Sequence, residues 1–137
     1  MRTCVETMTV ARKPRTLRAL LVGGNPVRLA ALEFELAKAG FEVTRAADGQ
    51  QAFEIAAKRR FDLLITEFQT ARGSGVDLAR QLRYLGTYDA TPMVLLAGCD
   101  ADLDLEFLRE SLWLLVIREP YAAAILVNRL ARHFQKV

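Results

Sequence analysis

The sequence of 137 residues is poor in the side chains that most often carry catalysis or cross-linking, with one histidine and two cysteines. The single histidine, His133, makes neither a metal cluster nor a catalytic triad, and no nucleophile is paired with a base. The cysteines, Cys4 and Cys99, give no disulfide framework, which favours a reduced, cytoplasmic protein. We therefore expect no enzyme, no cofactor and no metal site.

Long apolar runs and a charge excess of one sign are also missing from most of the chain. No run approaches the roughly 18 residues of a membrane span. Residues 1–16 carry four basic side chains against one acidic, whereas residues 17–137 hold 15 of each sign. The formal net charge of +3 therefore belongs to a basic, flexible leader. We expect neither a membrane-binding nor a nucleic-acid-binding face on the single domain at 17–137.

After the leader, apolar segments of strand length alternate with segments of helical pattern. Asn25 and Pro26 suit a helix start, and Gly40 suits a helix end. Nearly continuous apolar runs such as "MVLLA" are typical of strands buried on both faces of a parallel sheet. The expected strands are 18–22, 41–46, 61–66, 93–97 and 112–117, and the expected helices are 26–39, 49–59, 75–84, 101–110 and 121–135. The pattern predicts a doubly wound α/β domain.

Several motifs occur in a fixed order along these expected elements: "GFEVTRAADGQQAFEIA", "FDLLI", "GVDLARQLR", "TPMVLLAG" and "EPY". In combination they resemble a response-regulator receiver domain, the module of two-component signalling. The resemblance extends from about Arg18 to Phe134. It implies a flavodoxin-like (βα)5 fold, with a parallel five-stranded sheet, helices on both faces, and a role in signalling through protein contacts.

The family's phosphorylation site has five groups, and this sequence departs from all of them. The acidic pair that holds Mg²⁺ falls on Gly23 and Gly24, and the phosphoacceptor aspartate falls on Glu67. The hydroxyl position falls on Ala97, and the lysine before a cis-proline falls on Glu119. Phosphoryl transfer depends on a hard cation with oxygen ligands and on fixed donors. The resemblance therefore implies a pseudo-receiver that signals without phosphorylation.

Glu67 and Glu119 are expected to point into one shallow pocket, where two like charges need a cation or a shared proton. Arg72 and Arg118 are close in the sequence, but strand alternation turns Arg118 away from Glu119. Two alternatives stay open: Glu119 could turn into solvent, and Glu67 could mimic a phosphorylated aspartate, although we favour a domain held in one conformation. We also expect a cis peptide bond before Pro120.

Two surfaces are candidates for a protein partner. On the first expected helix, Phe34 lies about 140° from the stripe of core leucines, on the same side as Val27, as an exposed docking patch would. The resemblance adds the face of the fourth helix, fifth strand and fifth helix, through which a homodimer or another partner could assemble. The residues expected on that face are Leu103, Phe107, Ile125 and Arg129.

A function of another class also stays open. Gly23 and Gly24 directly precede the expected first helix, and such a turn lets a phosphate approach a helix N-terminus. The signal lacks the G-x-G-x-x-G pattern, and Pro26 removes one donor. The alternative to a protein-interaction module is therefore a flavodoxin-like domain that binds a small molecule or nucleotide.

Overall fold

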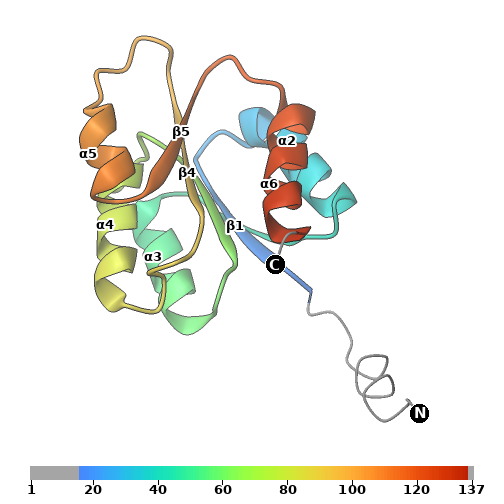
Figure 1. Cartoon of the computed structure of the whole chain (residues 1–137), viewed down its shortest axis with the longest axis horizontal. Helices are drawn as coiled ribbons and strands as arrows, with labels where there is room; N and C mark the ends of the chain where they lie inside the picture. The colour runs from blue at the N-terminus through green and yellow to red at the C-terminus, as the bar shows by residue number, and fades with distance from the viewer. Residues whose placement is uncertain (1–15, 136–137) are drawn as a thin grey trace.

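A parallel sheet of five strands forms the centre of the structure, a computed structural model that describes residues 16–135 (Figure 1). Its spatial order is β2-β1-β3-β4-β5, and every neighbouring pair is parallel. The strands are β1 (Arg18–Val22), β2 (Glu42–Ala46), β3 (Leu63–Glu67), β4 (Met93–Ala97) and β5 (Leu114–Arg118). The expected doubly wound sheet is thus confirmed. The leader predicted at 1–16 lies, apart from Thr16, outside the described residues.

Helices cover both faces of this sheet. They are α2 (Pro26–Lys38), α3 (Gly49–Lys58), α4 (Gly75–Leu85), α5 (Leu105–Glu110) and α6 (Ala123–Gln135). In Figure 1, α2 and α6 lie on one side of the sheet, and α3, α4 and α5 lie on the other. No helix among residues 16–135 is both long and apolar enough to cross a membrane.

Two apolar clusters hold these layers together, because successive side chains of a strand point to opposite faces. Leu20 and Val22 of β1 belong to the cluster under α3, α4 and α5, whereas Ala19 and Leu21 belong to the cluster under α2 and α6. All five residues of β3 are buried, as are all five of β4. Strands covered on both faces explain why these segments read as unbroken apolar runs.

The expected start and end of the first helix are confirmed in α2. The side-chain oxygen of Asn25 accepts from the backbone N–H groups of Val27 at 3.0 Å and Arg28 at 3.2 Å. Pro26 opens the helix, where its missing N–H has no intrahelical partner to lose. Gly40 follows the helix with a φ of +100°, a conformation that favours glycine.

The fourth helix is shorter than the sequence predicts, since α5 begins at Leu105 instead of residue 101. Asp104 caps it by accepting from the N–H of Phe107 at 3.1 Å, and Ala101 turns back to the carbonyl of Gly98. Strand β5 begins two residues later than expected, because Trp113 directly before it has a φ of +58°. The remaining boundaries agree with the expected ones within two residues.

Candidate functional site

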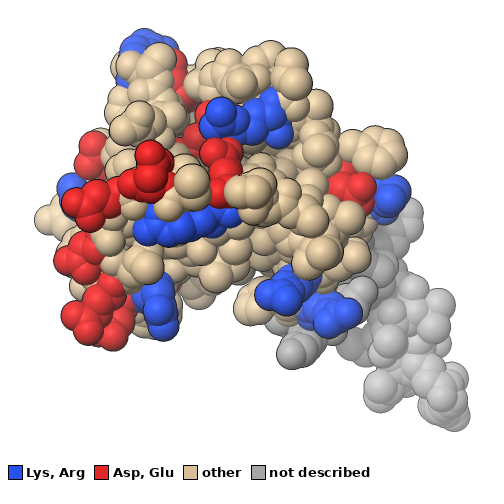
Figure 2. Space-filling model, turned by 90° about the horizontal axis from the view of Figure 1, so that it is seen from above, with Lys and Arg blue, Asp and Glu red and all other residues tan. Residues whose placement is uncertain are grey.

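The five positions singled out from the sequence meet at one edge of the sheet. Gly23 and Gly24 follow β1, Glu67 ends β3, Ala97 ends β4, and Glu119 follows β5. The carboxyl ends of parallel strands share one edge, which brings these residues together. Figure 2 views this side of the molecule and shows acidic and basic side chains gathered there.

Glu67 fills the space beside the first of the two glycines. Its residue is only 8% exposed, and the N–H of Gly24 donates a hydrogen bond to its carboxylate. A Cβ atom on Gly23 would lie 2.5 Å from Oε1 of Glu67 and 2.8 Å from a methyl group of Leu29. No side chain fits at position 23 while Glu67 keeps this conformation.

Arg28, in the first turn of α2, supplies the cation that the acidic pair needs. Its Nη1 lies 3.6 Å from Oε2 of Glu67 and 3.2 Å from Oε2 of Glu119. Both carboxylates line one hollow of about 540 Å³, as expected. The alternative in which Glu119 simply turns into solvent is wrong, because its side chain is 26% exposed and paired with Arg28.

Neither arginine considered from the sequence neutralises the pair. Arg72 forms an ion pair of 3.0 Å with Asp48, and Nη1 of Arg118 donates to the carbonyls of Gly98 and Ala101. Arg28 was missed because it precedes Glu67 by 39 positions and Glu119 by 91. Its place three residues after the capping Asn25 was the available signal, since a first helical turn faces the carboxyl edge of the sheet.

Burial is the main cause of the altered proton affinity of Glu67. It raises the pKa of Glu67 above the ordinary value, while the charge of Arg28 and the hydrogen bond from Gly24 oppose this shift. The neighbouring charge of Glu119 adds to the increase. Burial also raises the pKa of Tyr121, with smaller contributions from Glu119 and Glu67. The site therefore holds a carboxylate that favours its proton more than an exposed glutamate does.

The ends of β4 and β5 complete the site. Ala97 is buried, and its carbonyl accepts from the N–H of Glu119 at 2.8 Å. The bond between Glu119 and Pro120 is cis, as expected. Val116 is half-buried against the core. The side chains of Ala97 and Val116 offer neither a hydroxyl group nor an aromatic ring at this edge.

The residues at this edge do not fit the Mg²⁺ ion that the resemblance implies. Gly23 and Gly24 offer no side-chain oxygen, and the guanidinium of Arg28 lies between the remaining carboxylates. Among the described residues, no group of three or more histidine, cysteine or acidic side chains could hold a metal ion.

The turn before α2 has few free donors for a phosphate. The N–H of Gly23 donates to the carbonyl of Ala46, that of Gly24 donates to Glu67, and Pro26 has none. The amides of Val27 and Arg28 donate to Asn25. The carboxylate of Glu67 thus takes a donor that an anion would use, and its negative charge opposes a phosphate.

The surface residues expected to contact a partner fall into two groups. Val27 is 83% exposed and Phe34 is 63% exposed on α2, so these side chains do face solvent. Phe107, Ile125 and Arg129 are also exposed, on α5 and α6. Leu103 is different: it is half-buried and packs against the core under α5, because the chain there is a loop folded onto the sheet.

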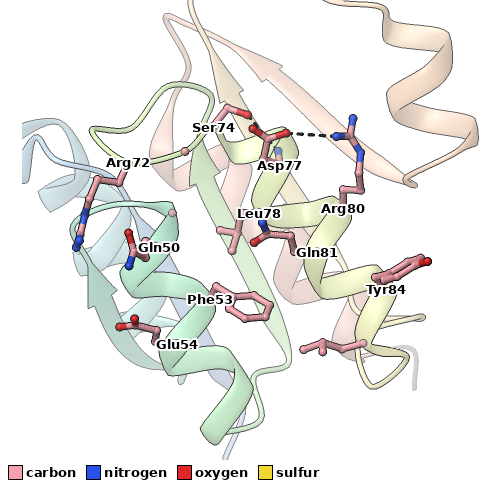
Figure 3. A pocket seen from close by; sticks show the side chains of 13 residues that line it. Gln50, Phe53, Glu54, Arg72, Ser74, Asp77, Leu78, Arg80, Gln81 and Tyr84 are labelled. Carbon is pink, nitrogen blue, oxygen red and sulfur yellow. Dashed lines mark hydrogen bonds and ion pairs between the residues drawn. The ribbon is translucent and has the colours of Figure 1, made fainter.

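A larger hollow of about 920 Å³ lies between α3 and α4 (Figure 3). Phe53 projects from α3, and Leu78 and Tyr84 project from α4. Two charged groups at its rim are paired with each other, since Arg80 lies 3.3 Å from Asp77. Of the residues named from the sequence for the site or the partner surfaces, Arg72 alone lines this hollow.

The strand order, the helices on both faces and the site at the carboxyl edge define a flavodoxin-like domain of the doubly wound class. The family model described as "Response regulator receiver domain" matches residues 19–112. The chain belongs to this family, a signalling module of two-component systems, and the resemblance found in the sequence is confirmed.

Curated relatives include a gliding motility regulatory protein of Myxococcus xanthus, 31% identical over 99 residues, which are 72% of this chain and 13% of that protein. The sensor protein EvgS of Escherichia coli (strain K12) is 33% identical over 70 residues, 51% of this chain and 6% of EvgS. The chain therefore spans only a small part of the length of the curated relatives it matches.

Solved structures agree on the fold. The chemotaxis protein CheY4 of Vibrio cholerae superimposes with a TM-score of 0.75 at 24% identity, covering 86% of this chain and 98% of that one. The receiver domain of the histidine kinase PA1611 of Pseudomonas aeruginosa PAO1, solved with magnesium in its active-site cleft, has a TM-score of 0.75 at 25% identity. That match covers 90% of this chain and all of the other.

Proposed function

We propose that this domain signals through protein contacts without being phosphorylated. One observation carries the proposal: Arg28 bridges Glu67 and Glu119 at the edge where the family binds its metal and its phosphoryl group. The positive charge at this edge belongs to the chain itself, so the two carboxylates share a cation that is not external.

The chemistry of the remaining groups supports the same conclusion. Phosphoryl transfer from a small donor needs a metal ion to neutralise the moving charge and fixed donors to bind the phosphoryl oxygens. Gly23, Gly24 and Ala97 supply neither ligand nor donor side chains, and Glu119 places a negative charge where the resemblance puts a lysine. We therefore assign no catalytic residue.

A domain held in one conformation fits these contacts better than a phosphomimetic switch. Glu67 is buried and hydrogen-bonded to Gly24, and neither Ala97 nor Val116 has a group that a phosphoryl mimic could attract or rotate. Binding a small molecule or nucleotide is less favoured, because Glu67 occupies the turn that its phosphate would use.

The test combines a phosphodonor with mass measurement. The chain is incubated with Mg²⁺ and acetyl phosphate, alongside an ordinary receiver domain as the positive control, and intact masses are recorded. We expect the control alone to gain a phosphoryl group. Thermal unfolding with and without Mg²⁺ should give the same Tm for this chain. A stoichiometric adduct on Glu67 would overturn the proposal.

Two surfaces are candidates for the partner contact. The patch of Val27 and Phe34 on α2 is exposed, with the Lys38 ammonium 5.4 Å from the Phe34 ring centroid. The face of α5, β5 and α6 is the other, and a second copy of the chain is one candidate for it. Recovery of a partner that falls with Phe34→Ala would favour α2. Unchanged recovery would remove Phe34.

A further inference from the structure

Two large apolar side chains are exposed at β5, the last strand in the order of the sheet. Trp113, directly before β5, is 67% exposed, and Leu115 within it is 49% exposed. Both side chains line two separate hollows, one on each face of the strand. Exposed apolar groups of this size at one place are typical of a contact surface.

The backbone of β5 is unpaired along this side. The strand ends the sheet order, so only β4 pairs with it among the described residues. The N–H of Glu119 points toward β4 and donates to Ala97. Backbone groups alternate along a strand, so those of Val116 and Arg118 point outward. An edge with free donors and acceptors is a template for another strand.

The two hollows exist because helices cover β5 incompletely. The short α5 leaves about 610 Å³ beside Leu105, Val116 and the Trp113 ring. The other helix, α6, packs on α2 through the second apolar cluster and leaves about 320 Å³ beside Ile117 and Leu126. An added strand needs such space on both faces, because its side chains point alternately to each.

The charge of these hollows is of one sign. Arg109 and Arg118 line the first and Arg129 lines the second, whereas no described lining residue is acidic. None of the three guanidinium groups lies within 4.0 Å of a carboxylate of the described residues. A bound segment would therefore gain from acidic side chains beside its apolar ones.

We propose that β5 binds an extended segment of a partner protein as an added strand, and that this segment carries both apolar and acidic residues on each of its faces. Main-chain hydrogen bonds to the free edge supply affinity, and the two hollows select the side chains. The inference rests on the proposed function in taking the partner to be a protein. A second copy is the poorer occupant, since a two-fold contact would bring the same basic linings together.

The experiment uses the single tryptophan of the chain, Trp113, as the reporter, because it borders both hollows. The full chain is titrated with a capped eight-residue peptide in which pairs of valines alternate with pairs of glutamates, so that each face of the extended peptide carries both residue types. We expect a saturable blue shift of the emission as the ring leaves water. A valine–lysine peptide should not bind, and neither should the acidic peptide with two central prolines, which lacks strand donors.

Charge reversal in the protein provides the second arm. Arg109→Glu and Arg129→Glu should each weaken binding of the acidic peptide by at least about tenfold, as loss of a close charge pair does. Arg132→Glu, also exposed on α6 but outside both hollows, is the matched control. It should change the affinity for the acidic peptide less than about twofold. Circular dichroism checks that each variant is folded.

Two results with the native chain would overturn the inference: no saturable emission shift with the acidic peptide, or equal affinity for the lysine or proline peptide. It would also be overturned if neither charge reversal changed the affinity for the acidic peptide. A dimer in sedimentation that the acidic peptide does not dissociate would likewise overturn it. Failure of the inference is separable from that of the proposed function. If the chain binds no peptide and gains no phosphoryl group, only the strand addition at β5 is refuted. If the chain gains a phosphoryl group, only the proposal of signalling without phosphorylation is refuted.

Discussion

Gly23 and Glu67 occupy one space at the carboxyl edge of the sheet. A Cβ atom on Gly23 would approach Oε1 of Glu67 to 2.5 Å, closer than Cβ atoms come to other heavy atoms in folded proteins. The glycine after β1 and the long acidic side chain at the end of β3 are therefore mutually dependent. A carboxylate at position 23 would require Glu67 to move or to be replaced.

This dependence predicts the cost of adding one methyl group. Gly23→Ala should lower the free energy of unfolding by about 1–3 kcal/mol, because the new methyl group overpacks the buried site. In a Glu67→Ala background the same substitution should cost at least about 0.5 kcal/mol less, since contacting residues couple by that amount or more. Urea unfolding of the four proteins measures the coupling.

Gly24→Ala is the matched control for that series. A Cβ atom on Gly24 would meet only the Ala47 carbonyl, at an ordinary 3.7 Å. We expect a change within about 1 kcal/mol, in the stabilising direction, because alanine restricts the unfolded chain. Equal losses from both alanines would contradict the shared space of Gly23 and Glu67.

Arg28 should matter more than an ordinary surface arginine. Arg28→Gln leaves Glu67 and Glu119 without their shared cation, and we expect a loss of about 1 kcal/mol near neutral pH, since Arg28 is half exposed to solvent. The loss should shrink when Glu119→Gln is added. Arg80→Gln, which breaks an ion pair exposed on both sides, should cost less than about 0.5 kcal/mol. Equal losses would mean that the bridge has no special role.

The titration of Glu67 predicts a pH dependence of stability. Burial raises the pKa of Glu67 in the folded state, so the folded chain holds this proton over a pH range where the unfolded chain has lost it. The contribution of Glu67 to stability is therefore full below the unfolded pKa and is lost as the pH rises through the folded pKa. Glu67→Gln removes this titration.

We expect the stability of the Glu67→Gln variant, relative to the native chain, to increase as the pH rises from about 4 to about 7. Urea unfolding at several pH values checks this. Glu106→Gln, at an exposed position on α5, is the control for a general charge effect. A difference between Glu67→Gln and the native chain that is constant with pH would contradict a raised pKa.

Arg83 ties the end of α4 to the segments on both sides of β4. Its guanidinium donates to the carbonyls of Tyr88, Asp89 and Thr91, and to those of Leu112 and Trp113 before β5. Arg83→Lys should lower the free energy of unfolding by about 2–3 kcal/mol, because a lysine cannot span this fork of carbonyls.

The control for Arg83→Lys is Arg80→Lys, one turn earlier on the exposed side of α4. We expect the control to stay within about 0.5 kcal/mol of the native chain. Thermal and urea unfolding compare the two directly. Similar Tm values for both lysine variants would show that the carbonyl contacts of Arg83 add no stability.

Most of the fold could be predicted because its signals are local. Hydrophobic periodicity identifies runs such as "MVLLA", and the residue types that favour helix ends identify the cap at Asn25 and the stop at Gly40. Each of these signals acts within a few residues. The late start of β5 could not be predicted, because the positive φ of Trp113 interrupts a run that is apolar throughout. The loop before α5 depends on Asp104, whose capping competes with a helical pattern in the surrounding residues.

The amino-acid sequence alone shows which groups the site lacks, since two glycines and an alanine have no side chain that can ligate or donate. It also determined the parallel sheet that brings Glu67 and Glu119 to one edge. The contact of Arg28 with both glutamates could be found only in the folded structure, because ion pairs between residues 39 and 91 positions apart depend on helix placement and not on local pattern. The uncovered edge of β5 was likewise decided by how α5 and α6 pack.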